Sequence, residues 1–173
     1  MQKMFTTQLL GLFTRIMDKE AYSIEDGARL LAQASAGEGV IYIKGFGEME
    51  GVVLEAINGP EPLENVRVLK DVADLKPIDR VLLFTRFSDD HKANEFAKQL
   101  EEKGISFVAV SGVKKTTEHH LPDVADVHIN TFVLKPLIPN EDGERVGFPT
   151  LIAGLYIYTC IKFILDEILT EYE

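Results

Sequence analysis

Apolar residues recur at helical spacing in the first part of the chain. One such face, within a predicted helix over 5–17, is formed by Leu9, Leu10, Phe13 and Ile16. Ser23 then precedes two carboxylates, Glu25 and Asp26, which favours a helix start with a hydroxyl at its N-cap and acids in its first turn. We therefore expect the chain to open with two amphipathic helices, the second ending near residue 36.

The pattern then changes to short runs rich in Val, Ile and Leu, bounded by turn residues. Such runs predict buried strands, and they occupy residues 40–43, 66–69, 80–84, 105–110 and 124–129. Helical spacing returns at 52–57 and from Asp89 or Asp90 to Glu102, where Lys103 and Gly104 end the helix. A short helix or turn is expected at 71–79, and Pro149 starts a last helix over about 150–169.

Strands that alternate with helices indicate right-handed crossovers and a parallel sheet covered on both faces, an α/β fold. We expect a single domain over 1–173, made of an N-terminal helical pair (1–36), a βαβ core (37–135) and a C-terminal helix (148–173). Ligands of such sheets bind outside the carboxyl ends of the strands. The segments to inspect are therefore 45–49, 85–89 and 111–115.

Composition supports a globular protein and narrows its partners. The 173 residues are 46% hydrophobic and 27% charged, with a net charge of -10. That charge argues against nucleic acid bound on a broad basic face, but a nest of backbone N–H groups can still hold a small phosphate. Cys160 is the only cysteine, so no intramolecular disulfide forms, and its apolar surroundings favour an inert thiol.

The sequence also predicts where the protein resides. The N-terminus lacks the basic segment, apolar core and cleavage site of a secretory signal. The most apolar run, 151–165, is interrupted by Lys162 and is too short to span a bilayer. We expect a cytoplasmic protein without a membrane partner.

The glycine-containing turn after the first strand is the leading candidate for a binding loop. Gly45, Phe46 and Gly47 would let a ligand approach the backbone N–H groups and the N-terminus of the next helix. Glu48 would repel an anion there, and a plain strand-to-helix turn remains the alternative. A dinucleotide fingerprint needs a third glycine where Glu50 stands, which argues against nicotinamide binding.

Two further strand ends carry polar candidates. Thr85, Arg86 and Ser88 supply two hydroxyls and a guanidinium at the start of a helix, which is a reasonable phosphate site. Ser111 ends the next strand and precedes Lys114 and Lys115. Local capping and a solvated loop are the alternatives for these two segments.

The histidines do not suggest a metal or cofactor. His119 and His120 are adjacent and therefore point in different directions, while His91 and His128 are isolated. We expect no metal site and no cofactor.

In order, the segments 39–47, 79–88, 105–112 and 125–129 resemble the sugar isomerase (SIS) domain, and within it the phosphoheptose isomerase branch. They look closest to an uncharacterised bacterial SIS-like family. The resemblance covers nearly the whole chain. It implies a three-layer αβα sandwich of flavodoxin type with a five-stranded parallel sheet, a phosphosugar at the strand ends, and a homodimer or homotetramer formed through the N-terminal helices.

The chain departs from the SIS pattern at the positions that bind phosphate. The first SIS loop usually reads Gly-Asn-Gly-Gly-Ser, and here Met49 stands at the serine position. The second loop usually reads Ser-x-Ser-Gly. Thr85 can replace its first hydroxyl, but the second falls on Phe87 unless Ser88 substitutes.

Catalytic residues of phosphoheptose isomerases are also largely unmatched. Their His and Glu on the helix after the first loop align with Glu55 and Gly59, and the C-terminal helix has no His. Glu55 is therefore the one candidate catalytic base, with an exposed helix-face glutamate as the alternative. The leading hypothesis is a SIS-fold sensor or regulatory module that binds a phosphorylated sugar or related carbohydrate. A sugar-phosphate isomerase and a structural protein without a ligand are the alternatives.

Overall fold

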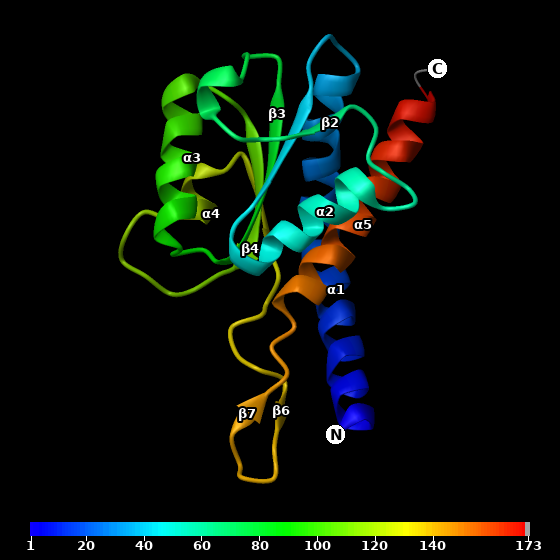
Figure 1. Ribbon diagram of the computed structural model, residues 1–173, viewed down its shortest axis with the longest axis vertical. Helices are drawn as coiled ribbons and strands as arrows, with labels where there is room; N and C mark the ends of the chain where they lie inside the picture. The colour runs from blue at the N-terminus through cyan, green and yellow to red at the C-terminus, as the bar shows by residue number, and fades with distance from the viewer. Residues whose placement is uncertain (172–173) are drawn as a thin grey trace.

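The computed structural model describes residues 1–171, and its centre is a parallel sheet between two helical layers (Figure 1). The five strands are ordered β2-β1-β3-β4-β5, and all neighbouring pairs are parallel. Their bounds are β1 Ile41–Gly45, β2 Val66–Val68, β3 Arg80–Phe87, β4 Phe107–Gly112 and β5 Val127–Asn130. The predicted α/β fold and five-stranded parallel sheet are confirmed.

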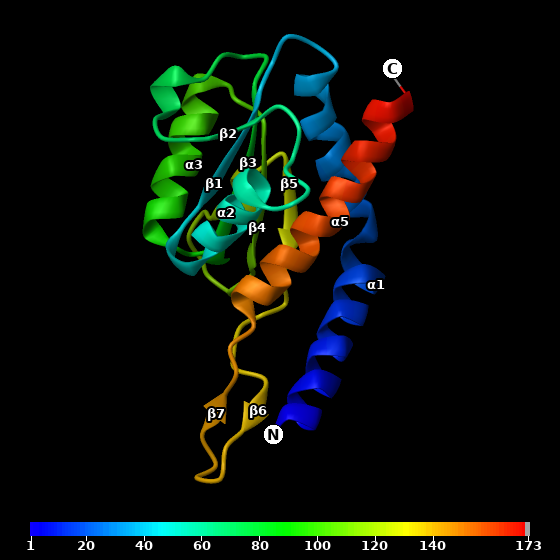
Figure 2. The ribbon, with the colours of Figure 1, turned by 45° about the vertical axis from the view of Figure 1, so that its right-hand side comes forward.

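Helices cover both faces of this sheet (Figure 2). The helices α1 (Gln2–Ser35), α2 (Glu50–Asn58) and α5 (Thr150–Glu171) lie on one face. The other face is covered by α3 (His91–Lys103), the short α4 (Leu121–Val124) and the 3-10 turn η2 (Val72–Asp74). A second 3-10 turn, η1 (Gly47–Met49), joins β1 to α2. This is the expected three-layer sandwich.

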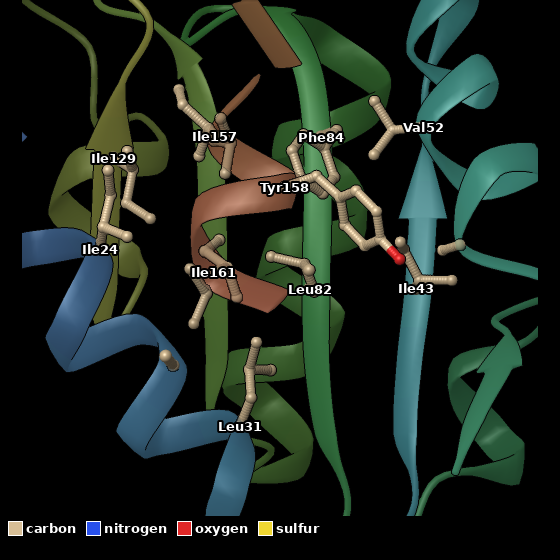
Figure 3. Close-up of a cluster of buried hydrophobic side chains, with 14 of the residues drawn as sticks. Ile24, Leu31, Ile43, Val52, Leu82, Phe84, Ile129, Ile157, Tyr158 and Ile161 are labelled. Atoms are coloured by element: carbon tan, nitrogen blue, oxygen red, sulfur yellow. The ribbon is translucent and has the colours of Figure 1, made fainter. Parts of the chain in front are cut away.

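The larger of two apolar cores lies between α1, α5 and the sheet. Figure 3 shows Ile157 and Ile161 of α5 over the central strands, with Ile24 and Leu31 of α1 beside them. All four side chains are at most 1% exposed. Each such aliphatic side chain contributes roughly 1.5–3 kcal/mol by leaving water, so this layer fixes the strand ends in space.

Local signals in the sequence account for the ends of α3. Asp90 is the N-cap, and its Oδ1 accepts a hydrogen bond from the Ala93 N–H at 2.8 Å. Gly104 ends the helix in the left-handed region at φ 70°, which glycine adopts without steric cost. Both predicted boundaries are confirmed.

The prediction of two N-terminal helices is wrong, because α1 runs without a break from Gln2 to Ser35. Its buried stripe continues through Ile16 and Ile24, four positions on either side of Glu20. Glu20 is polar but half-buried, and its carboxylate interacts with Ser23 and with the backbone of Asn130. Ser23 therefore lies inside the helix and caps nothing.

The segment between β5 and α5 contains structure that the sequence did not predict. Strands β6 (Ile138–Pro139) and β7 (Arg145–Val146) pair as an antiparallel hairpin. In Figures 1 and 2 this hairpin and the first turns of α1 extend together beyond the end of the sheet where β5 finishes. The two segments thus form a projection next to the carboxyl edge of the sheet.

Candidate functional site

The strand order locates the candidate site between β1 and β3. From β1 the chain passes to β2 on one side and then returns to β3 on the other side, so the direction of winding changes between these two strands. Ligands of open α/β sheets bind at such a switch point, outside the carboxyl ends. A hydrogen bond from Phe46 N–H to Phe84 O, at 2.9 Å, joins the two strand ends here.

Two glycines shape the turn after β1. A Cβ on Gly45 would lie 2.4 Å from Met49 O and 2.7 Å from Glu50 N, so only glycine fits where the turn folds back on itself. Gly47 has φ 58°, in the left-handed region. The predicted turn at 45–47 therefore exists, and its tightness explains both glycines.

The side chains of Phe46 and Met49 point away from the strand-end edge. Phe46 packs edge-on against Phe96 of α3, with ring centroids 5.8 Å apart. Met49 is fully buried and contacts Gly154 of α5. The buried Met49 can therefore offer a ligand only its backbone, whereas the ring of Phe46 is partly exposed. Met49 belongs to the core, which explains an apolar residue at this position.

An ion pair connects η1 to the end of β3 at the switch point. Arg86 Nε donates to Glu48 Oε1 at 2.6 Å, and its Nη2 donates to Glu48 Oε2 at 2.8 Å. The guanidinium lowers the pKa of the Glu48 carboxyl, and the carboxylate raises the pKa of Arg86. Arg86 remains 52% exposed and Glu48 31% exposed, so the pair faces solvent.

The hydroxyls expected at the site make internal contacts. Ser88 is buried, and its Oγ accepts from Lys114 N–H at 3.0 Å. Ser111 Oγ lies 2.7 Å from His128 Nε2. Thr85 is 1% exposed. Arg86 is thus the side chain of this predicted set that is open to a ligand.

The N-terminus of α3 also carries its own acid. The carboxylate of Asp90 caps the helix, and Lys114 Nζ lies 3.6 Å from Asp89 Oδ2. Anions favour helix N-termini, and here a side chain of the protein takes that position. Both places where an incoming anion would bind, Arg86 and the start of α3, are therefore occupied by carboxylates of the chain.

An aromatic pair lies beside Arg86. Phe87 and Phe148 pack edge to face with centroids 6.0 Å apart, and Lys114 Nζ lies 4.0 Å from the centroid of Phe87. Phe148 is 43% exposed. Sequence reasoning missed this contact because Phe148 lies far along the chain, just before α5.

The structure does not bring Glu55 to the Glu48–Arg86 pair by any hydrogen bond or ion pair within residues 1–171. Glu55 is exposed on α2, next to Gly59 at the end of that helix. It is also close enough to Tyr158 of α5 to help raise the pKa of that phenol to about 12, although burial is the larger cause. Its proposed role as a base stays a hypothesis.

The described residues, 1–171, contain no cluster of three or more His, Cys, Asp or Glu side chains suited to a metal. His120 Nδ1 instead bonds Asp123 Oδ2 at 2.7 Å. Within the same range, no helix combines the length and apolar character needed to cross a membrane.

The family model described as "Domain of unknown function (DUF2529)" matches residues 1–169. Uncharacterized protein YwjG of Bacillus subtilis (strain 168) is 45% identical over 173 residues, which cover 99% of each chain.

Solved structures show that the fold is that of SIS domains, as the sequence predicted. A phosphoheptose isomerase from Francisella tularensis superposes with a TM-score of 0.65 at 13% identity, over 96% of each chain. The sugar isomerase domain of an RpiR transcription factor from Sphaerobacter thermophilus gives 0.57 at 14% identity, over 98% of this chain and 89% of that one.

Proposed function

We propose that this chain, which belongs to the DUF2529 family, binds a phosphorylated sugar or related carbohydrate derivative as a sensor or regulatory module. The observation that carries the proposal is the position of Arg86, a half-exposed guanidinium at the switch point between β1 and β3. Its planar fork suits phosphate as well as carboxylate, and both bind it in a bidentate manner.

Binding then proceeds by exchange of one anion for another. Arg86 holds the carboxylate of Glu48. An incoming phosphate takes the guanidinium, and Glu48 turns out toward solvent. The aromatic pair of Phe87 and Phe148 offers an apolar surface to the sugar ring beside this position.

The similarity to a phosphoheptose isomerase and to the sugar isomerase domain of a transcription factor supports this class of ligand. The side chains at the carboxyl edge of the sheet favour a sensor role over isomerisation. A proton shuttle between adjacent sugar carbons needs an acid and a base within hydrogen-bond reach of the substrate. Glu55, the candidate base, is exposed on α2 and forms no hydrogen bond or ion pair with Glu48 or Arg86 among residues 1–171.

Thermal unfolding with a panel of sugar phosphates, nucleotide sugars and the unphosphorylated parent sugars tests the proposal. A ligand at 100 times its dissociation constant adds roughly 2.7 kcal/mol to stability. We expect a shift with a phosphorylated compound, none with its parent sugar, and at least a tenfold loss of affinity in Arg86→Ala.

The chain offers a matched control. Arg29 forms a similar exposed pair with Glu25 on α1, through Nε and Nη2 at 3.0 and 2.8 Å. Arg29→Ala should bind as the unaltered protein does. If the whole panel gives no shift, or if Arg86→Ala binds normally, the proposal is wrong. Solvent proton exchange into a bound sugar phosphate, followed by NMR, would favour the isomerase instead.

We also propose a homodimer or homotetramer formed through α1 and α5, which lie side by side in Figures 1 and 2. Phe13 of α1 stacks on Tyr156 of α5 with centroids 4.3 Å apart. Nearby apolar side chains are exposed, Leu10 by 60% and Phe163 by 58%. Such surfaces on paired helices suit contact with a second copy.

A further inference from the structure

A cavity lies between the N-terminal half of α1 and the chain that follows β5. Its volume is about 370 Å³, which is in the range of small-molecule sites. Apolar atoms form much of its wall, from Leu12 of α1 and from 132–137. None of its lining residues belongs to the Glu48–Arg86 pair, so it is a separate site.

Three cations line this cavity: Arg15 of α1, Lys135 of the loop after β5, and Arg145 of β7. None of them takes part in any ion pair found among residues 1–171. Arg86 and Arg29, in contrast, are each held by a glutamate. In a chain of net charge -10, a cluster of three cations without carboxylate partners is unusual and attracts anions.

The two arginines among these cations contact neutral groups of the protein. Arg145 donates from Nε to Pro136 O at 2.9 Å and from Nη2 to Leu137 O at 2.8 Å, so its guanidinium is fixed by neutral carbonyls. The guanidinium carbon of Arg15 lies 4.4 Å from the ring centroid of Phe132. Arg15 and Arg145 thus contact neutral groups of the cavity wall, while Arg15, Lys135 and Arg145 all remain exposed to solvent.

The backbone of Phe132 adds an independent observation. Its φ is 57°, in the left-handed region that bulky residues rarely adopt. The conformation is held by a hydrogen bond from Phe132 N–H to Asn130 Oδ1 at 2.8 Å. It places the ring in the cavity wall under Arg15. Strained residues of this kind concentrate at ligand sites, which supports a binding role for the loop.

We propose that this cavity binds a small phosphomonoester that also has an apolar ring or chain. The three cations match the two negative charges of a phosphate, and bidentate contacts to an arginine favour phosphate geometry. Leu12, Val133 and Leu137 provide the apolar surface for the rest of the molecule. The site is independent of the proposed sugar site at Arg86.

Gly11 makes a clean test possible. It lines the cavity, and a Cβ at this position meets no atom within 4 Å. Gly11→Leu therefore adds a large side chain to the cavity wall without a clash at its Cβ, and leucine favours a helix more than glycine does. Arg15→Gln removes one of the cations. Lys19→Gln, an exposed position farther along α1 and outside the cavity lining, makes the same change of charge and is the matched control.

The experiment is an NMR titration with phenyl phosphate at constant ionic strength, followed through the amide signals of 132–137, with benzyl alcohol as the uncharged probe. We expect saturable shifts with phenyl phosphate alone. Arg15→Gln should weaken binding at least tenfold and Gly11→Leu should abolish it, while Lys19→Gln binds normally. An absence of shifts at 10 mM phenyl phosphate, which is roughly the weakest affinity of interest, overturns the proposal. So does binding that survives Gly11→Leu, or an equal loss of affinity in Arg15→Gln and Lys19→Gln.

Discussion

Replacing Glu48 with glutamine should strengthen the binding of a phosphorylated ligand. The substitution keeps the shape of the side chain and removes the charge that holds Arg86 Nε and Nη2 at 2.6 and 2.8 Å. A phosphate then meets a guanidinium with no competing carboxylate. The pair is partly exposed to solvent, so its own contribution to stability is small.

Two free-energy contributions determine how much Glu48→Gln should strengthen phosphate binding. Breaking an exposed ion pair costs roughly 0.2–1 kcal/mol, and this cost disappears in Glu48→Gln. A carboxylate left near a bound phosphate adds a repulsion of about 1 kcal/mol per pair of unit charges at 4 Å in water. The sum, about 1–2 kcal/mol, corresponds to an affinity that is about 5- to 30-fold tighter.

Isothermal titration of the unaltered protein, Glu48→Gln and Glu25→Gln with the same sugar phosphate measures this gain. Glu25→Gln removes the equivalent exposed carboxylate from Arg29 and should leave the affinity unchanged. Unchanged or weaker binding by Glu48→Gln would refute the exchange of anions, because it would mean that Glu48 is itself a ligand contact or that phosphate binds elsewhere.

The pH dependence of the same site follows from the pKa of Glu48. Arg86 lowers this pKa below its ordinary value of 4.5. The carboxylate therefore stays ionised from neutral pH down to that value, and its contribution to stability is lost only as the pH falls through the lowered pKa. Between pH 8 and pH 5, mild acid should not reproduce the effect of Glu48→Gln on binding.

Three further predictions concern stability and assembly. Burial lowers the pKa of His128 from 6.5 to about 4. As the pH falls, this histidine is therefore protonated in the unfolded chain before it is protonated in the folded one. The free energy of unfolding should fall by roughly 3 kcal/mol between pH 7 and pH 4. Urea unfolding across this range measures the loss, and His128→Gln should flatten the profile. Gly45→Ala should lower the free energy of unfolding by about 1–3 kcal/mol, because its methyl group would meet Met49 O at 2.4 Å. Gly11→Ala, whose methyl group meets open space, should raise it by up to about 1 kcal/mol in the same assay. Phe163→Lys on α5 should shift the mass measured by light scattering toward the monomer, and an unchanged mass would exclude this face from the interface.

The strands and most helix ends could be predicted from local signals. The run at 80–84 is apolar after Arg80, as expected of a strand buried on both faces, and recognising such a run needs no long-range information. Asp90 and Gly104 mark the ends of α3 for equally local reasons. The order of these elements was enough to predict the parallel sheet and its carboxyl edge.

Features that depend on distant partners could not be predicted in this way. Glu20 interrupts the apolar stripe of α1, and its contact with the end of β5 is invisible in the sequence, so one helix looked like two. Met49 reads as a lost phosphate ligand until α5 is known to pack against it. Glu48 and Arg86 carry opposite charges and lie at the ends of adjacent strands, so their pairing is the one contact of the site that local sequence signals could have indicated.

The carboxylates at the strand ends bear on how a sensor of this fold would work. Glu48 pairs with Arg86, and Asp90 caps the N-terminus of α3. The two anion-binding positions at the carboxyl edge of the sheet are therefore already paired with carboxylates of the protein. Ligand binding must then displace a side chain of the protein rather than water alone. Glu48 lies in η1, between β1 and α2, and the next residue of that turn, Met49, packs against Gly154 of α5. A change at the binding edge thus has a direct packed route to the helix face that we propose as the subunit contact. A module that reports ligand binding needs a coupling of this kind between its binding site and a distant surface.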